Sequence, residues 1–179
     1  MNLRELICRA LMLARRDRTS EDIEDFINED DGVDVAAFIN DAAAIVYREN
    51  WRPLKVELMT PENGYVYPDA VSIDRIETEG GAMLRFEAGA EGIRVFGAAG
   101  QVRVYYRYMP PDLSDDEDEP LFPKFAHSCL CDYAAYAISN VGERAAIRGE
   151  SHMMDFERKR ALIPRNDVLG AAFINKYTI

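Results

Sequence analysis

The chain has 179 residues, of which 48% are hydrophobic, and its formal net charge at pH 7 is −11. The apolar content excludes a globally disordered chain, and the acidity argues against phosphate-backbone binding as the main activity, because that affinity comes from Lys and Arg. No apolar run is long enough to cross a bilayer, and arginines interrupt the N-terminal segment where a signal peptide would need an apolar core. We therefore expect a soluble protein that does not interact with a membrane.

Helical spacing of apolar residues dominates the N-terminal part of the chain. Asn2 can cap a helix over 3–16, whose apolar residues recur every three to four positions opposite a set of arginines. Acids in a first turn predict a second, shorter helix over about 20–32. Asp34 is the expected cap of a third helix over 35–49.

From residue 54 the apolar period changes to the two-residue period of a β-strand. Apolar and charged residues alternate over 54–58, and turns at 61–64, 80–81, 89–92 and 97–100 separate further short strands up to residue 108. Short strands at this spacing predict a small antiparallel sheet, sandwich or barrel. The glycines do not match a phosphate-binding loop, because they lack the Lys-Ser/Thr ending and a following helix.

Three further features of this region are predicted from its residues. The apolar phase slips between Ile73 and Ile76, which indicates a β-bulge. A single strand is predicted over 83–87. Trp51, the only tryptophan, is expected to fill the junction between the helices and the sheet, because its ring can bury a large area.

An acidic run at 112–119 holds six carboxylates in eight residues. Like charges this dense repel each other and stay in water, so the run predicts a mobile, solvated loop. The alternative is a loop that repels DNA or meets a basic partner. The acidic residues of the loop are Asp112, Asp115, Asp116, Glu117, Asp118 and Glu119.

An apolar stripe with helical spacing follows over 122–141 and predicts the longest helix of the chain. Gly149 is expected as a helix stop, and a further charged helix is predicted over 150–163, ended by Pro164.

The last 15 residues are too apolar for a free tail. We expect this C-terminal arm either to dock on the chain's own fold or to reach a neighbouring subunit. The interface candidates within it are Val168, Leu169, Phe173, Ile174, Tyr177 and Ile179.

No constellation of side chains indicates catalysis or a metal. His127, Cys129 and Cys131 cannot all ligate one ion on a helix, because residues i and i+2 point in nearly opposite directions. Together with Cys8 the chain has three cysteines, an odd number, and they are expected to be reduced and to pack in the core. Tyrosines and arginines at 65–67 and 103–108 could stack on bases, but they are also ordinary strand composition. The sequence therefore predicts no enzyme, no cofactor and no metal site.

Three stretches, in this order of elements, resemble the head-to-tail connector (adaptor or neck) proteins of tailed bacteriophages. They are the helix end before Trp51, the segment Y-V-Y-P-D at 65–69 that follows a strand and a turn, and D-Y-A-A-Y at 132–136 in a later helix. The resemblance spans most of residues 1–163.

The resemblance implies a virion structural protein rather than an enzyme. It implies a homo-oligomeric ring, a dodecamer in the virion, that binds the portal protein at the neck, extends the DNA channel and presents a platform to a tail or neck protein. DNA would pass through without specific binding, and the ring would be assembled in the host cytoplasm. The alternatives are another phage neck or tail-completion protein and, in a different class, a small cytoplasmic enzyme or ligand-binding protein. An enzyme would need a concave pocket with titratable groups of shifted pKa.

The predicted fold is of the α+β class, with a helical bundle built from both chain ends and an inserted small antiparallel β-sandwich or barrel-like module. The expected parts are N-terminal helices, a β module, an acidic linker, C-terminal helices packing on the first part, and a C-terminal arm. Their ranges are 1–53, 54–109, 110–120, 121–163 and 164–179.

Overall fold

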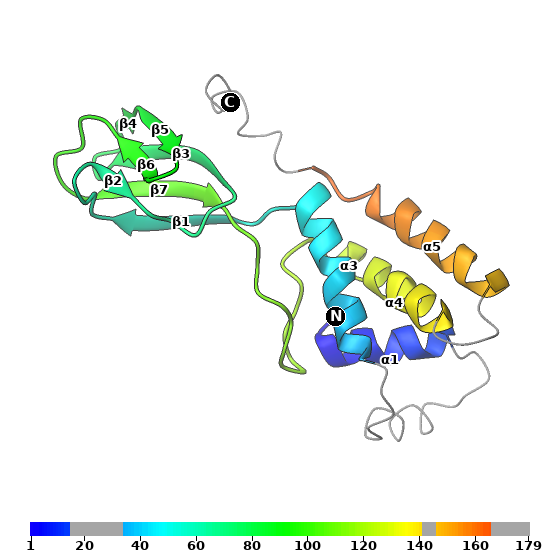
Figure 1. Cartoon of the computed structure of the whole chain (residues 1–179). Helices are drawn as coiled ribbons and strands as arrows, with labels where there is room; N and C mark the ends of the chain where they lie inside the picture. Colours follow the sequence, from blue (N-terminus) through cyan, green and yellow to red (C-terminus); the bar gives the residue numbers. More distant parts are fainter. Residues whose placement is uncertain (15–33, 141–145, 166–179) are drawn as a thin grey trace. The chain divides into compact units, whose positions relative to one another are not determined.

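The computed structural model describes residues 1–14, 34–140 and 146–165 (Figure 1). These residues form a mixed α and β protein with four α-helices and two antiparallel sheets. They divide into a helical unit, from Met1–Trp51 and Pro110–Arg165, and a β unit, Arg52–Met109. Neither sheet closes into a barrel, so the barrel-like alternative is wrong. The helix predicted over about 20–32 and the C-terminal interface candidates lie outside the described residues.

Two capped helices begin the helical unit. In α1, Leu3–Ala14, the Asn2 side chain accepts from Glu5 N at 2.9 Å, and the Glu5 carboxylate accepts from Asn2 N at 3.2 Å. This reciprocal pair satisfies two backbone donors that a helix start would otherwise leave unpaired. In α3, Val35–Glu49, Asp34 accepts from Ala37 N at 2.9 Å. Both predicted caps are confirmed.

The second half of the helical unit differs from its prediction. A short 3₁₀ turn, η1 (Lys124–Ala126), precedes α4, Ser128–Asn140, which at 13 residues is shorter than α3 and α5 with 15 residues each. The prediction of one long helix is therefore wrong for the described part of the chain. Phe125 also departs from the predicted stripe, because its side chain is exposed.

Gly149 lies inside α5, Ala146–Arg160, so the prediction that it stops a helix is wrong. A Cβ at this position would lie 3.1 Å from Asn140 Oδ1 and 3.5 Å from the ring of Tyr136. The glycine therefore lets the backbone of α5 pass close to α4, which offsets the cost of glycine in a helix interior.

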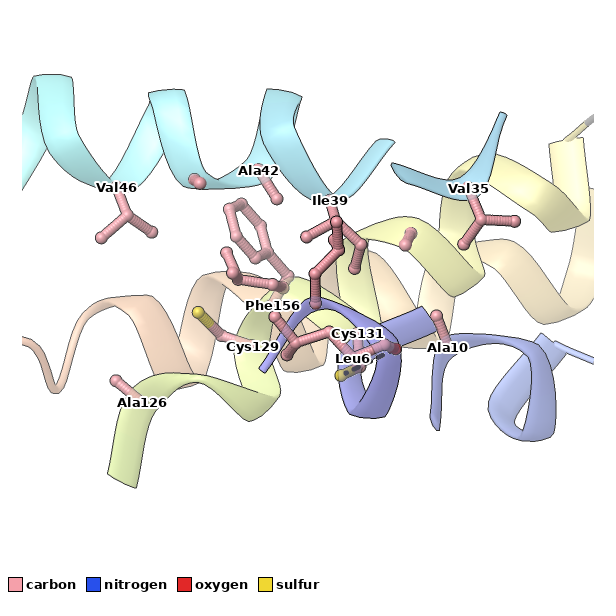
Figure 2. Close-up of a cluster of buried hydrophobic side chains, with 14 of the residues drawn as sticks. Leu6, Ala10, Val35, Ile39, Ala42, Val46, Ala126, Cys129, Cys131 and Phe156 are labelled. Atoms are coloured by element: carbon pink, nitrogen blue, oxygen red, sulfur yellow. Dashed lines mark hydrogen bonds between the residues drawn. The ribbon is translucent and has the colours of Figure 1, made fainter. Parts of the chain in front are cut away.

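All four helices of this unit contribute to one apolar core. Ile39, Ala42 and Val46 on α3 point toward side chains of α1 and α4 (Figure 2). Phe156 of α5 is fully buried in the same cluster. Trp51 is half-buried and packs against this helical core.

The β unit contains seven short strands in two sheets. One sheet has the order β1-β7-β3-β4 and the other the order β2-β6-β5, and each adjacent pair is antiparallel. The strands are β1 (Leu54–Met59), β2 (Tyr65–Val66), β3 (Ser72–Thr78), β4 (Met83–Leu84), β5 (Phe86–Gly89), β6 (Gly92–Val95) and β7 (Val102–Arg107).

Local sequence signals place these strands well, with one exception. The register between β3 and β7 shifts between Ile73 and Arg75, which confirms the predicted bulge. Asn63 and Gly64 have positive φ angles of 52° and 84° and form the two-residue turn before β2. The single strand predicted over 83–87 is wrong, because β4 and β5 lie in different sheets.

One apolar cluster receives side chains from both sheets, including Ile76 of β3, Val95 of β6 and Val104 of β7. At one end of the four-stranded sheet, Arg107 of β7 forms a 2.9 Å ion pair with Asp74 and donates to the carbonyl of Arg52. Arg107 is almost fully buried, so this pair joins the start of β1 to β3 in a desolvated position.

Candidate functional site

The acidic loop at 112–119 is the candidate functional surface, because it gathers the densest charge of the chain. The side chains of Asp112, Asp115, Asp116, Glu117 and Glu119 are exposed, and that of Asp118 is half-buried. The loop has no helix or strand and faces water, as a run of like charges requires.

Asp118 organises the loop from within. Its Oδ2 accepts hydrogen bonds from Asp115 N at 2.9 Å and from Ser114 N at 2.8 Å, while Asp118 N donates to Asp115 O. The bond from Asp115 N, followed by that from Ser114 N, lowers the pKa of Asp118 below its ordinary value. The ionised carboxylate therefore holds the turn in place.

The backbone of the loop completes the N-terminal end of α1. Leu3 N donates to Asp118 O at 2.8 Å, and Arg4 N donates to Asp116 O at 3.2 Å. Both donors belong to the first helical turn, where no intrahelical acceptor exists. The Arg4 guanidinium also lies 3.7 Å from the Asp116 carboxylate.

A second anchor comes from α3. The Asn40 amide donates to Leu113 O at 3.0 Å and accepts from Leu113 N at 2.9 Å, so both backbone groups of one loop residue are paired. The Leu113 side chain packs against the helical core. The sequence predicts a mobile loop, whereas the structure ties the loop to two helices through its backbone. Charge repulsion keeps the carboxylates in water but does not prevent their backbone from being bound.

Beyond the loop, an aromatic contact fixes the entry to α4. Tyr47 Oη accepts from Leu121 N at 2.8 Å, and the Tyr47 ring meets the buried Phe122 edge-on, with centroids 5.7 Å apart. His127 is fully buried and its Nε2 bonds to Phe122 O at 2.9 Å. Burial lowers the pKa of His127, so its neutral form is favoured.

The sequence predicts one helix for His127, Cys129 and Cys131, but the structure places only the two cysteines within α4. His127 precedes α4, while Cys129 and Cys131 are free thiols buried in the core. Burial raises the pKa of both thiols to about 12, which makes them unreactive packing residues. Among the described residues, no group of three or more His, Cys, Asp or Glu side chains could hold a metal ion.

Sequence reasoning missed a buried ion pair between α4 and α5. Asp132 is 2% exposed, and Lys159 Nζ lies 2.6 Å from its carboxylate. Burial raises the pKa of Asp132, although Lys159 opposes this. The sequence held a signal, because Asp132 is the one charged residue within the largely apolar stretch 129–135. Two surface recesses, over α1 and over the β5–β6 hairpin, contain neither Asp132 nor His127.

The charge of the chain is divided unevenly between the two units. Residues 1–51 and 110–165 contain 13 Lys or Arg and 23 Asp or Glu. Residues 52–109 contain 7 Lys or Arg and 8 Asp or Glu. The acidic loop therefore belongs to the part of the sequence that carries nearly all of the net negative charge. In the described ranges, no helix is both long and apolar enough to span a membrane.

No protein-family model matches this chain, and no curated protein matches its sequence.

Proposed function

We propose that this chain is a head-to-tail adaptor of a tailed bacteriophage. It would be the subunit of a ring beneath the portal protein, located at the neck of the virion and assembled in the host cytoplasm. The ring extends the DNA channel and gives a tail or neck protein its attachment platform. The resemblance at 65–69 and 132–136 suggests this class, and it implies a structural rather than an enzymatic role.

The observation that carries the proposal is the anchored acidic loop. Its five exposed acids stand on a backbone that α1 and α3 hold in place, within the acidic part of the sequence. A fixed carboxylate surface repels phosphates and offers DNA no cation to bind. Such a surface suits a channel through which DNA must slide without being retained.

The finer architecture is also part of this proposal. The helices on both sides of the β unit would form one bundle, with the β unit as an insertion at 54–109. The C-terminal arm at 164–179, which includes Phe173 and Tyr177, would contact a neighbouring subunit or the portal. A ring subunit needs such a contact, because each copy must bind two neighbours.

The first prediction concerns binding to the portal. Purified protein, added to DNA-filled capsids of the parent phage that bear a portal but no tail, should co-sediment with them. Electron microscopy should then show added ring-shaped density beneath the portal. A chain ending at Pro164 is the matched variant, and it should keep its thermal unfolding profile while losing most of the capsid-bound density.

Absence of the full chain from the capsids would refute the adaptor proposal. A full chain that stays off the capsids but binds a small molecule would move the enzyme or ligand-binding alternative to first place. Ring density from the truncated chain equal to that of the full chain would refute the role of the C-terminal arm alone.

A further inference from the structure

Strand β1 has an open edge with an apolar face. It ends the four-stranded sheet, with β7 on one side and no strand among the described residues on the other. Leu54, Val56 and Leu58 share one face of β1 and are 44%, 48% and 53% exposed. Edge strands of stable monomers are normally short, charged or covered, whereas this face of the six-residue strand β1 is apolar and exposed among the described residues.

The backbone of β1 also points outward at these three residues. Tyr108 N donates to Pro53 O, and the register pairs Lys55 with Tyr106 and Glu57 with Val104. Because hydrogen-bonded pairs alternate along an antiparallel ladder, residues 53, 55 and 57 direct their backbone groups to β7. Leu54, Val56 and Leu58 therefore direct their N–H and C=O groups toward the open edge.

The side chains of β1 are complementary to a second, antiparallel copy of the same strand. With Val56 opposite Val56 of the second copy, Leu54 of each copy meets Leu58 of the other. In the same register, Lys55 of each copy lies directly opposite Glu57 of the other. Opposite charges and apolar pairs in direct cross-strand positions stabilise a sheet, whereas like charges in those positions destabilise it. The register that satisfies the backbone thus also satisfies both kinds of side chain.

We infer that two copies of this chain pair through β1, antiparallel and centred on Val56, so that their four-stranded sheets join into one continuous sheet. Glu57 is already held in place for this contact, since its carboxylate accepts from Tyr106 Oη at 2.6 Å and lies 3.4 Å from Lys55 Nζ. The two-fold axis would place Lys55 and Glu57 of both copies in an array of alternating sign. It would also bring the two apolar stripes side by side.

A second copy fits this edge better than an unrelated strand, because the five-residue pattern Leu-Lys-Val-Glu-Leu is complementary to itself. The opposite edge of the same sheet lacks this property, since β4 has only two residues. A two-fold contact uses the same surface on both partners and closes on itself. The inference therefore concerns the free protein and does not rest on the proposed ring.

Charge reversal in the full chain tests this pairing by sedimentation velocity over a concentration series. Wild type should shift from monomer to dimer as its concentration rises. Lys55→Glu and Glu57→Lys should each weaken self-association by about tenfold, because each places like charges directly opposite at two positions. An equimolar mixture of these two variants should dimerise at concentrations where neither does alone, because every cross-strand charge pair is then opposite in sign.

Two apolar-to-lysine substitutions form a matched pair, one at the proposed interface and one as the control. Val56→Lys places two cations at the two-fold axis and should abolish the dimer. Met83→Lys changes a 61% exposed residue on the opposite edge strand, β4, and should dimerise like wild type. Circular dichroism and thermal unfolding confirm that each variant is folded, and recovery in the mixture shows the same for the charge reversals.

Three results would overturn the inference. The first is a wild-type chain that remains monomeric at every concentration. The second is a dimer that Val56→Lys and both charge reversals leave unchanged, which would place self-association on another surface. The third is a failure of the mixed variants to associate.

Discussion

Asp132 is the one carboxylate among the described residues whose side chain is buried. Lys159 of α5 donates a hydrogen bond to the Asp132 carboxylate at 2.6 Å and so stabilises its ionised form. Burial still raises the pKa of Asp132 above its ordinary value of 3.8. Because the folded-state pKa lies above the unfolded one, the contribution of Asp132 to stability is complete below the unfolded pKa. It is lost as the pH rises through the folded pKa.

Replacing the partner tests this assignment. Lys159→Met should lower the free energy of unfolding by about 2 kcal/mol at neutral pH, because it leaves a buried carboxylate without a cation. The loss should be smaller at a more acidic pH at which Asp132 is protonated, because a neutral carboxyl group needs no cation. Denaturant unfolding at both pH values measures the difference.

The neighbouring cation gives the control for this experiment. Arg158 pairs with Asp155, but its side chain is 74% exposed, so Arg158→Met should change the free energy of unfolding by less than about 0.5 kcal/mol. An equal loss at both pH values for Lys159→Met would contradict an ionised, paired Asp132.

Among the elements, the acidic loop depends on a helix far from it in sequence. Asn40 of α3 pairs both backbone groups of Leu113, and Asp118 O receives a hydrogen bond from the first turn of α1. A loop of irregular structure must find partners for its backbone groups, and here the helices provide them. The loop is therefore part of the helical unit rather than a free connection.

The prediction at this scale is that Asn40 holds the loop. Asn40→Ala should accelerate amide hydrogen exchange at Leu113 and lower the free energy of unfolding by about 1–2 kcal/mol, because two half-buried backbone groups lose their partner. Asp41→Ala, at the exposed next position on the same helix, is the control and should leave exchange at Leu113 unchanged. Protection of Leu113 that survives Asn40→Ala would mean that the α1 contacts hold the loop alone.

At the scale of the whole molecule, the described chain has two separate apolar cores. The helical core includes Ile39 and the β core includes Ile76, and both side chains are fully buried. Each core is enclosed by the elements of its own unit. We therefore expect the two units to unfold in separate steps.

A matched pair of substitutions tests this expectation. Ile39→Ala and Ile76→Ala remove the same groups, and each should cost about 2–5 kcal/mol in its own unit. In calorimetry, Ile39→Ala should lower the transition of the helical unit alone, and Ile76→Ala that of the β unit alone. A single transition that both variants shift equally would show instead that the two units unfold together.

The sequence by itself determined the features that depend on neighbouring residues. The caps at Asn2 and Asp34, the turn at Asn63-Gly64 and the bulge after Ile73 follow from local hydrogen bonding, backbone freedom and side-chain period. The exposure of the acidic loop follows from charge alone.

Only the tertiary structure decided which partner each of these features meets. The alternation of apolar and charged residues over 54–58 predicts a strand, but the open edge and exposed apolar face of that strand follow from the strand order. Gly149 indicates a helix stop by local rules. In the structure it lies within α5, where the absence of a Cβ allows α5 to pack close to α4. Asn40, which anchors the loop at Leu113, lies 73 positions away from it in the sequence. Lys159, which pairs with Asp132, lies 27 positions away from it. Such contacts arise when separate segments bury their apolar faces together, and no local pattern records them.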